Sequence, residues 1–176
     1  MKTKPGTRTG NGFSTFWGDL MASMTYKGAE TITDKLIQLG DGAEKIAKVS
    51  LYEGAAVMLD ALEESIRALP ETTSAKPYDG LLPDDKEDMI AGLGVARFEV
   101  AGDAVNTKIS VSGYTRRTEK KWPNGVPLPM LARSLESGSS MRKKHPFVRP
   151  AARAAHARIV AAIQAKMDDE INRLTK

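Results

Sequence analysis

The chain has 176 residues, a formal net charge of +4, no Cys and two His. The length suits one domain with a buried core, and the lack of Cys excludes a disulfide framework, thiolate metal sites and a cysteine nucleophile. No apolar run approaches the ~20 residues that a membrane span needs, and the N-terminal residues lack the apolar stretch of a signal peptide. We therefore expect a soluble, intracellularly folded protein without catalytic activity and without a cofactor or metal.

The first 28 residues are predicted to form an N-terminal arm, rich in Gly and polar residues at its start. Further along the arm, apolar side chains follow the spacing of one helical face: Phe13, Phe16, Trp17, Leu20, Met21 and Met24. Three interpretations remain open. The face caps the domain's own core, docks in a groove on a neighbouring subunit, or lies on a membrane surface. The second interpretation makes four residues candidates for a subunit interface: Phe13, Phe16, Trp17 and Leu20.

Residues 29–176 are predicted to form a single α+β domain that begins with helices. A short helix over 33–39 ends at Gly40, and the capping-box pattern of Asp41 and Glu44 begins a long helix that ends before Pro70. Its expected buried stripe consists of Ile46, Val49, Tyr52, Ala56, Leu59, Leu62, Ile66 and Leu69.

A third, shorter helix is predicted to follow Pro83 and to be closed by Gly92 and Gly94. Four carboxylates lie at its start: Asp84, Asp85, Glu87 and Asp88. Carboxylates in a first turn complement the positive end of the helix dipole. This position explains them without metal or acid–base chemistry.

Alternating apolar residues predict strands over 95–100 and 105–111, joined by a tight turn at Gly102 and Asp103. Two strands alone are marginal in water, so a helix cover or further strands are needed. Residues 114–122 would supply a weak third strand, and a strand from a neighbouring subunit would serve equally well.

Residues 113–148 are irregular apart from a short helix near 130–135. Basic residues flank Tyr114 and Trp122, as in loops that bind nucleic acid, although a solvated loop is the alternative. The candidate DNA contacts are Arg116, Arg117, Lys120, Lys121, Arg142, Lys143 and Lys144.

The last predicted element is a long amphipathic helix that starts at Arg149 and Pro150. Its expected buried stripe is Ala155, Ile159, Ile163, Met167, Ile171 and Leu174, with His156 beside it. The whole pattern predicts an α+β fold, in which one long helix from each half of the chain packs on a small antiparallel sheet built around a hairpin.

Charge is divided unevenly along this fold. Residues 1–112 carry 12 basic and 17 acidic residues, whereas residues 113–176 carry 14 basic and 5 acidic residues. One interpretation is that the basic half binds phosphate groups. A second is that acidic and basic faces of neighbouring copies pack head to tail, which closes into a ring when the rotation allows it. The third alternative is that both are solvated faces of one fold.

The order of several short segments resembles the tail-component family of long-tailed phages, also called tail-completion or head–tail joining proteins. A long helix ending in Ala68-Leu69-Pro70 precedes a hairpin, then Leu135-Glu-Ser-Gly-Ser-Ser140, then His145-Pro-Phe-Val-Arg-Pro-Ala151 at the start of the last helix. The family's Thr-Gly-x-Leu segment has its nearest match at Asp79-Gly80-Leu81-Leu82, after an insertion, and the arm has no counterpart.

The resemblance implies a structural virion protein without enzymatic activity. It would form a ring, most simply a hexamer, at the neck or tail junction, where it would contact connector, head-closure and tail-tube proteins. DNA passing through the lumen would contact basic loops. Phe147 and Arg149 become candidate interface residues because two prolines stiffen the segment that presents them, although Phe147 packing under the last helix of its own chain is the alternative. A basic, non-specific DNA-binding protein remains the second function.

Overall fold

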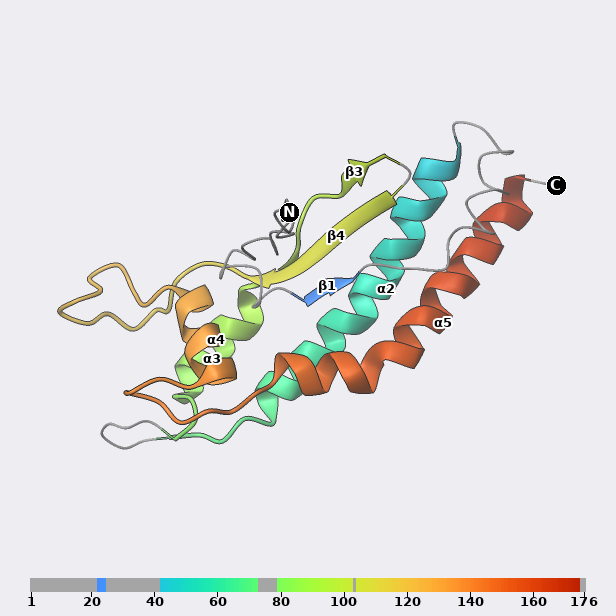
Figure 1. Cartoon of the computed structure of the whole chain (residues 1–176). Coiled ribbons are helices and arrows are strands. Elements are labelled where there is room, and N and C mark those ends of the chain that lie inside the picture. Colours follow the sequence, from blue (N-terminus) through green and yellow to red (C-terminus); the bar gives the residue numbers. More distant parts are fainter. Residues whose placement is uncertain (1–21, 25–41, 73–78, 103, 175–176) are drawn as a thin grey trace, which may run out of the picture.

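The computed structural model describes residues 22–24, 42–72, 79–102 and 104–174. The elements in chain order are β1 (Ala22–Met24), α2 (Gly42–Arg67), α3 (Pro83–Ala91), β2 (Leu93–Val95), β3 (Glu99–Ala101), β4 (Ala104–Val111), α4 (Leu128–Ser137) and α5 (Val148–Leu174). The long helices α2 and α5 lie side by side over one face of an antiparallel sheet, while α3 and α4 lie together at one end (Figure 1). The predicted α+β class, with a long helix from each half packed on a small sheet, is confirmed.

Strand β4 is the centre of the sheet. It pairs with β1 on one side and with β2 and β3 on the other. The β3–β4 register, with Ala101 opposite Ala104, confirms the predicted hairpin, and Gly102 takes the positive φ of +64° that such a tight turn requires. The single strand predicted over 95–100 is wrong, because residues 96–98 belong to no strand and separate β2 from β3. Strand β2 already includes Gly94, so this residue does not close α3 as expected.

The third strand comes from a part of the chain where a helix was expected. Residues 114–122 form a loop with isolated bridges, whereas Ala22–Met24 pairs with Thr107–Ile109 of β4. Met24 was expected on the helical face of the arm, and its strand conformation corrects that prediction. Pairing satisfies backbone N–H and C=O groups along one side of β4, and such a tertiary contact overrides local apolar spacing.

The core lies between the helix layer and the sheet. Four residues of the predicted α5 stripe are buried: Ala155, Ile159, Ile163 and Met167. The stripe predicted for the first long helix is confirmed at Ile46, Leu62, Ile66 and Leu69, but Tyr52 is 59% exposed. Tyr52 follows Ile46 by six residues, which rotate about 600° around the helix axis. This is about 120° less than two full turns, so Tyr52 lies on another side of the helix than Ile46. The actual stripe instead includes Leu51, Ala55 and Met58.

Candidate functional site

The segments that carry the family resemblance meet at one corner of the molecule, next to the C-terminal end of α4 (Figure 1). The guanidinium of Arg142 is buried and donates to the carbonyl oxygen of Gly80. The backbone N–H of His145 donates to the carbonyl oxygen of Leu135 over 2.8 Å. Segment 145–151 is thus bonded directly to segment 135–140, and Arg142, which lies between these two segments, bonds the chain to segment 79–82.

Glu136 joins α4 to the start of α5. Its side chain is 6% exposed, and its Oε2 accepts the backbone N–H of Phe147 at 2.8 Å and that of Val148 at 3.0 Å. Its Oε1 accepts the N–H of Arg149 at 3.4 Å. The carboxylate therefore serves as the N-terminal cap of α5, satisfying donors that have no intrahelical partner and complementing the helix dipole.

No structural role was predicted for Glu136 from the sequence. The sequence indicates only indirectly that α5 needs a cap from elsewhere in the chain: no Ser, Thr, Asp or Asn lies directly before this helix. The free N–H groups at the start of α5 therefore required an acceptor from elsewhere in the chain.

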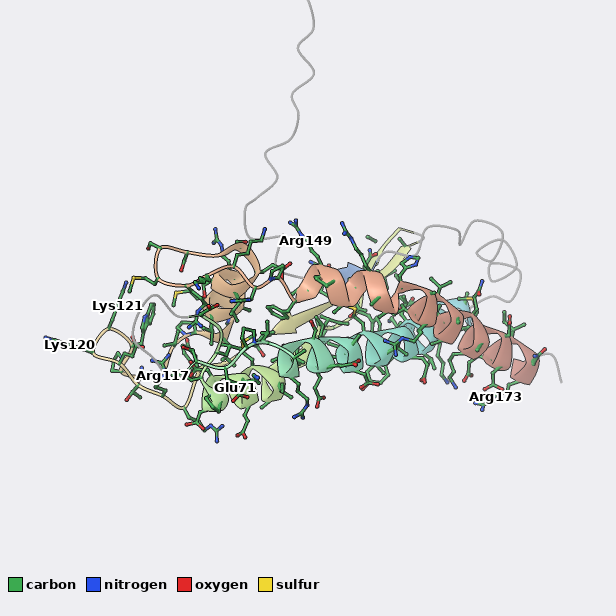
Figure 2. The ribbon with its side chains drawn as sticks, turned by 90° about the horizontal axis from the view of Figure 1, so that it is seen from below. Glu71, Arg117, Lys120, Lys121, Arg149 and Arg173 are labelled. Atoms are coloured by element: carbon green, nitrogen blue, oxygen red, sulfur yellow. The ribbon has the colours of Figure 1, made fainter. Side chains whose placement is uncertain are left out.

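Phe147, a candidate interface residue, belongs to the core of its own chain. It is 1% exposed, and its carbonyl oxygen accepts the hydroxyl of Ser65 in α2 at 3.0 Å. Phe147 therefore packs within its own chain, as the alternative prediction stated. It has almost no exposed surface with which to contact a neighbouring subunit. Arg149 differs: its side chain is 72% exposed and points outward (Figure 2).

Two candidate DNA contacts, Arg116 and Arg117, are paired within the chain. Arg117 Nε and Nη2 donate to the carboxylate of Asp85 at 3.3 and 3.1 Å, and the side chain of Asp85 is fully buried. Arg116 Nε donates to Asp88 at 2.6 Å, and its Nη2 donates to Glu87 at 2.9 Å. The α3 carboxylates thus anchor the loop that follows β4, a role that first-turn position alone did not predict.

These pairs shift the pKa values of both guanidinium groups. The hydrogen bonds that Arg116 donates to Glu87 and, second, to Asp88 raise its pKa above the ordinary value. The hydrogen bond to Asp85 is the largest cause that raises the pKa of Arg117. In both cases the carboxylates stabilise the charged form of the guanidinium group.

Arg142 and Lys143 are also paired, and both hold the corner of the three segments. Lys143 Nζ lies 2.6 Å from Asp79 Oδ2, and His145 Nε2 lies 2.7 Å from Asp79 Oδ1. The hydrogen bond from Lys143, followed by that from His145, lowers the pKa of Asp79 below its ordinary 3.8. Lys144, in contrast, is exposed.

Lys120 and Lys121 form the tip of a projecting turn. The backbones of Glu119 and Trp122 exchange hydrogen bonds of 3.0 and 2.8 Å, which leaves the two lysines at the end of the loop (Figure 2). Lys121 Nζ lies 5.7 Å from the ring centroid of Trp122. Gly125 at the base has a φ of +92°, and a Cβ there would lie 2.0 Å from the carbonyl oxygen of Thr115. The turn is therefore fixed in shape at its base.

The remaining interface candidates, Phe13, Phe16, Trp17 and Leu20, lie outside the described residues, as does the helix predicted over 33–39. Within the described ranges, no group of three or more His, Asp or Glu side chains could hold a metal ion. A search of the same ranges for a helix with the length and hydropathy of a membrane span finds none. The chain matches no protein-family model, no curated protein and no solved structure.

Proposed function

We propose that this chain is a structural virion protein of a long-tailed phage, assembling as a ring at the neck or tail junction. The observation that carries the proposal is the corner at α4. The resemblance depends on a Glu-x-Gly-Ser segment and a Pro-Phe-Val-Arg-Pro segment. These two segments contact each other, because Glu136 accepts the backbone N–H of Phe147. A shared motif whose two parts contact one another is a structural unit, which favours the resemblance over a coincidence of short sequences.

The corner suits a protein that works by presenting surfaces. Glu136 and Arg142 fix the start of α5 relative to α4 and Gly80. An assembly surface built on fixed elements loses little conformational entropy on association. Arg149 lies at this rigid junction and is exposed, so it remains our candidate for contact with a neighbouring subunit.

Deleting the gene from the phage that carries it tests the proposal and separates the roles within it. If the protein joins heads to tails, the deletion yields full heads and complete tails that do not attach. If it ends tail growth, the tails become longer than in the wild type. If it closes the head, the heads lose their DNA. Electron microscopy of the particles distinguishes these outcomes, and normal infectious particles without the protein would refute the proposal.

A second measurement addresses the ring itself. We expect the full-length protein, alone or with its tail and connector partners, to form closed rings, with six subunits as the number that the resemblance implies. Light scattering coupled to gel filtration gives the mass, and negative-stain images give the symmetry. A strictly monomeric species under both conditions would contradict the ring.

The projecting turn favours non-specific DNA binding as a second function. Lys120 and Lys121 lie at the end of the molecule opposite Arg173 (Figure 2), and the ammonium group of Lys121 lies over the Trp122 ring. We expect Lys120→Ala with Lys121→Ala to weaken binding to duplex DNA, because each lost phosphate contact removes a salt-dependent increment. The matched control is Lys48→Ala with Arg67→Ala, because these two cations of α2 are exposed to solvent and already form ion pairs with Glu44 and Glu63. Filter binding at several salt concentrations measures the effect, and an unchanged affinity and salt slope would remove this function.

A further inference from the structure

The two long helices carry opposite charges over much of their length. Residues 49–66 of α2 contain four acidic residues and no basic residue, whereas residues 148–165 of α5 contain three Arg and no acidic residue. At 1.5 Å per residue, each stretch extends over about 27 Å.

Three of the four acidic residues of the α2 stretch lie along one side of their helix, and two of the three Arg of the α5 stretch lie along one side together with His156. Arg158 is nine residues from Arg149 and therefore lies about 180° around α5 from it. In α2, Glu53, Asp60 and Glu64 are exposed and lie seven and four residues apart, which aligns them; we call them the acidic face. In α5 the corresponding basic face consists of the exposed residues Arg149, Arg153 and His156, spaced by four and three residues.

The two faces do not neutralise each other within the chain. Of these six residues, only Arg149 forms an ion pair with a described residue, at 4.0 Å from Glu136. In Figure 2 the helices α5 and α2 follow opposite edges of the helix layer, and the side chain of Arg149 points away from α2. Each copy therefore presents to solvent an acidic face on α2 and a basic face on α5.

We infer that the basic face of α5 docks on the acidic face of α2 in a second copy of this chain. Docking in this way leaves the acidic face of one copy and the basic face of the other free for further copies. Such a head-to-tail contact closes into a ring when the rotation between copies allows it. The inference rests on the proposed ring and names the surfaces that build it.

Charge reversal on each face tests the contact. One variant combines Asp60→Arg with Glu64→Arg, and the other combines Arg153→Glu with His156→Glu. None of the four side chains has an ion-pair partner among the described residues, so the fold should be retained, as circular dichroism would verify. We expect each variant alone to self-associate at least about tenfold more weakly than the wild type, because like charges then face each other.

Mixing the two variants gives the sharper result. The basic α5 of the first variant meets the acidic α2 of the second, and the reversed faces also complement each other. Sedimentation equilibrium of the mixture is therefore expected to show recovered association, with the variants alternating. The control variant, Lys120→Glu with Lys121→Glu, makes a comparable change in charge away from both faces and should associate as the wild type does. Rising salt should weaken the wild-type assembly.

The outcomes separate this contact from the proposed function. Reversed variants that assemble as well as the wild type would overturn the docking of α5 on α2 and leave the ring in place. A mixture that stays dissociated would also overturn it. A wild-type chain that remains monomeric, alone and with its tail and connector partners, would defeat both the contact and the ring.

Discussion

Replacing Arg117 by Met is expected to lower the free energy of unfolding by about 3 kcal/mol. The substitution leaves the carboxylate of Asp85 buried without its guanidinium partner, and Asp85 has no exposed surface through which water could replace it. An uncompensated buried charge usually costs about 3–5 kcal/mol. The lower end applies here because Asp85 lies in the first turn of α3, where the helix dipole still favours a negative charge.

Two further variants make this expectation specific. Arg116→Met is the matched control, because the side chain of Arg116 is 62% exposed and Asp88 still accepts the backbone N–H of residue 116 at 2.7 Å, so the loss should be about 1 kcal/mol or less. The double variant Asp85→Leu with Arg117→Met removes both charges and should recover most of the stability. Urea denaturation measures all three. If the double variant is no more stable than Arg117→Met, the loss of stability does not come from the unpaired, buried carboxylate of Asp85.

Replacing Glu136 by Ala is expected to cost about 3 kcal/mol and to lower the melting temperature by about 10 °C. Three backbone N–H groups at the start of α5 lose their acceptor, and one of them belongs to the buried Phe147. The loss exceeds that of an ordinary exposed cap, typically about 1 kcal/mol, because the carboxylate is buried and bears the charge that the helix terminus favours.

Glu136→Gln separates the two contributions. It keeps one oxygen acceptor and the volume of the side chain but removes the charge, so we expect about half of the loss seen with Ala. Ser137→Ala, at the exposed neighbouring position, is the control and should change stability by less than about 0.5 kcal/mol. Thermal unfolding followed by circular dichroism gives the values. A Glu136→Ala protein as stable as the wild type would rule out the capping role.

The features that the sequence determined by itself are those encoded by neighbouring residues. The i, i+4 row from Ala155 to Met167 predicted the buried side of α5, and Pro70 marked the end of the long helix near Arg67. Alternating side chains and a glycine turn predicted the β3–β4 hairpin. In each case the signal and the structure lie within a few residues of one another, so periodicity and turn chemistry suffice.

The tertiary structure alone decided which charged residues face solvent. Arg117 and Lys120 are three residues apart in one basic loop and look alike in the sequence. Arg117 pairs with Asp85, which lies 32 positions away, whereas Lys120 is at the exposed tip. The acceptor that caps α5 likewise comes from α4, through Glu136. Composition does not encode such partners, because an ion pair depends on the distance between two side chains in space, and only the packing of α3, α4 and α5 sets that distance.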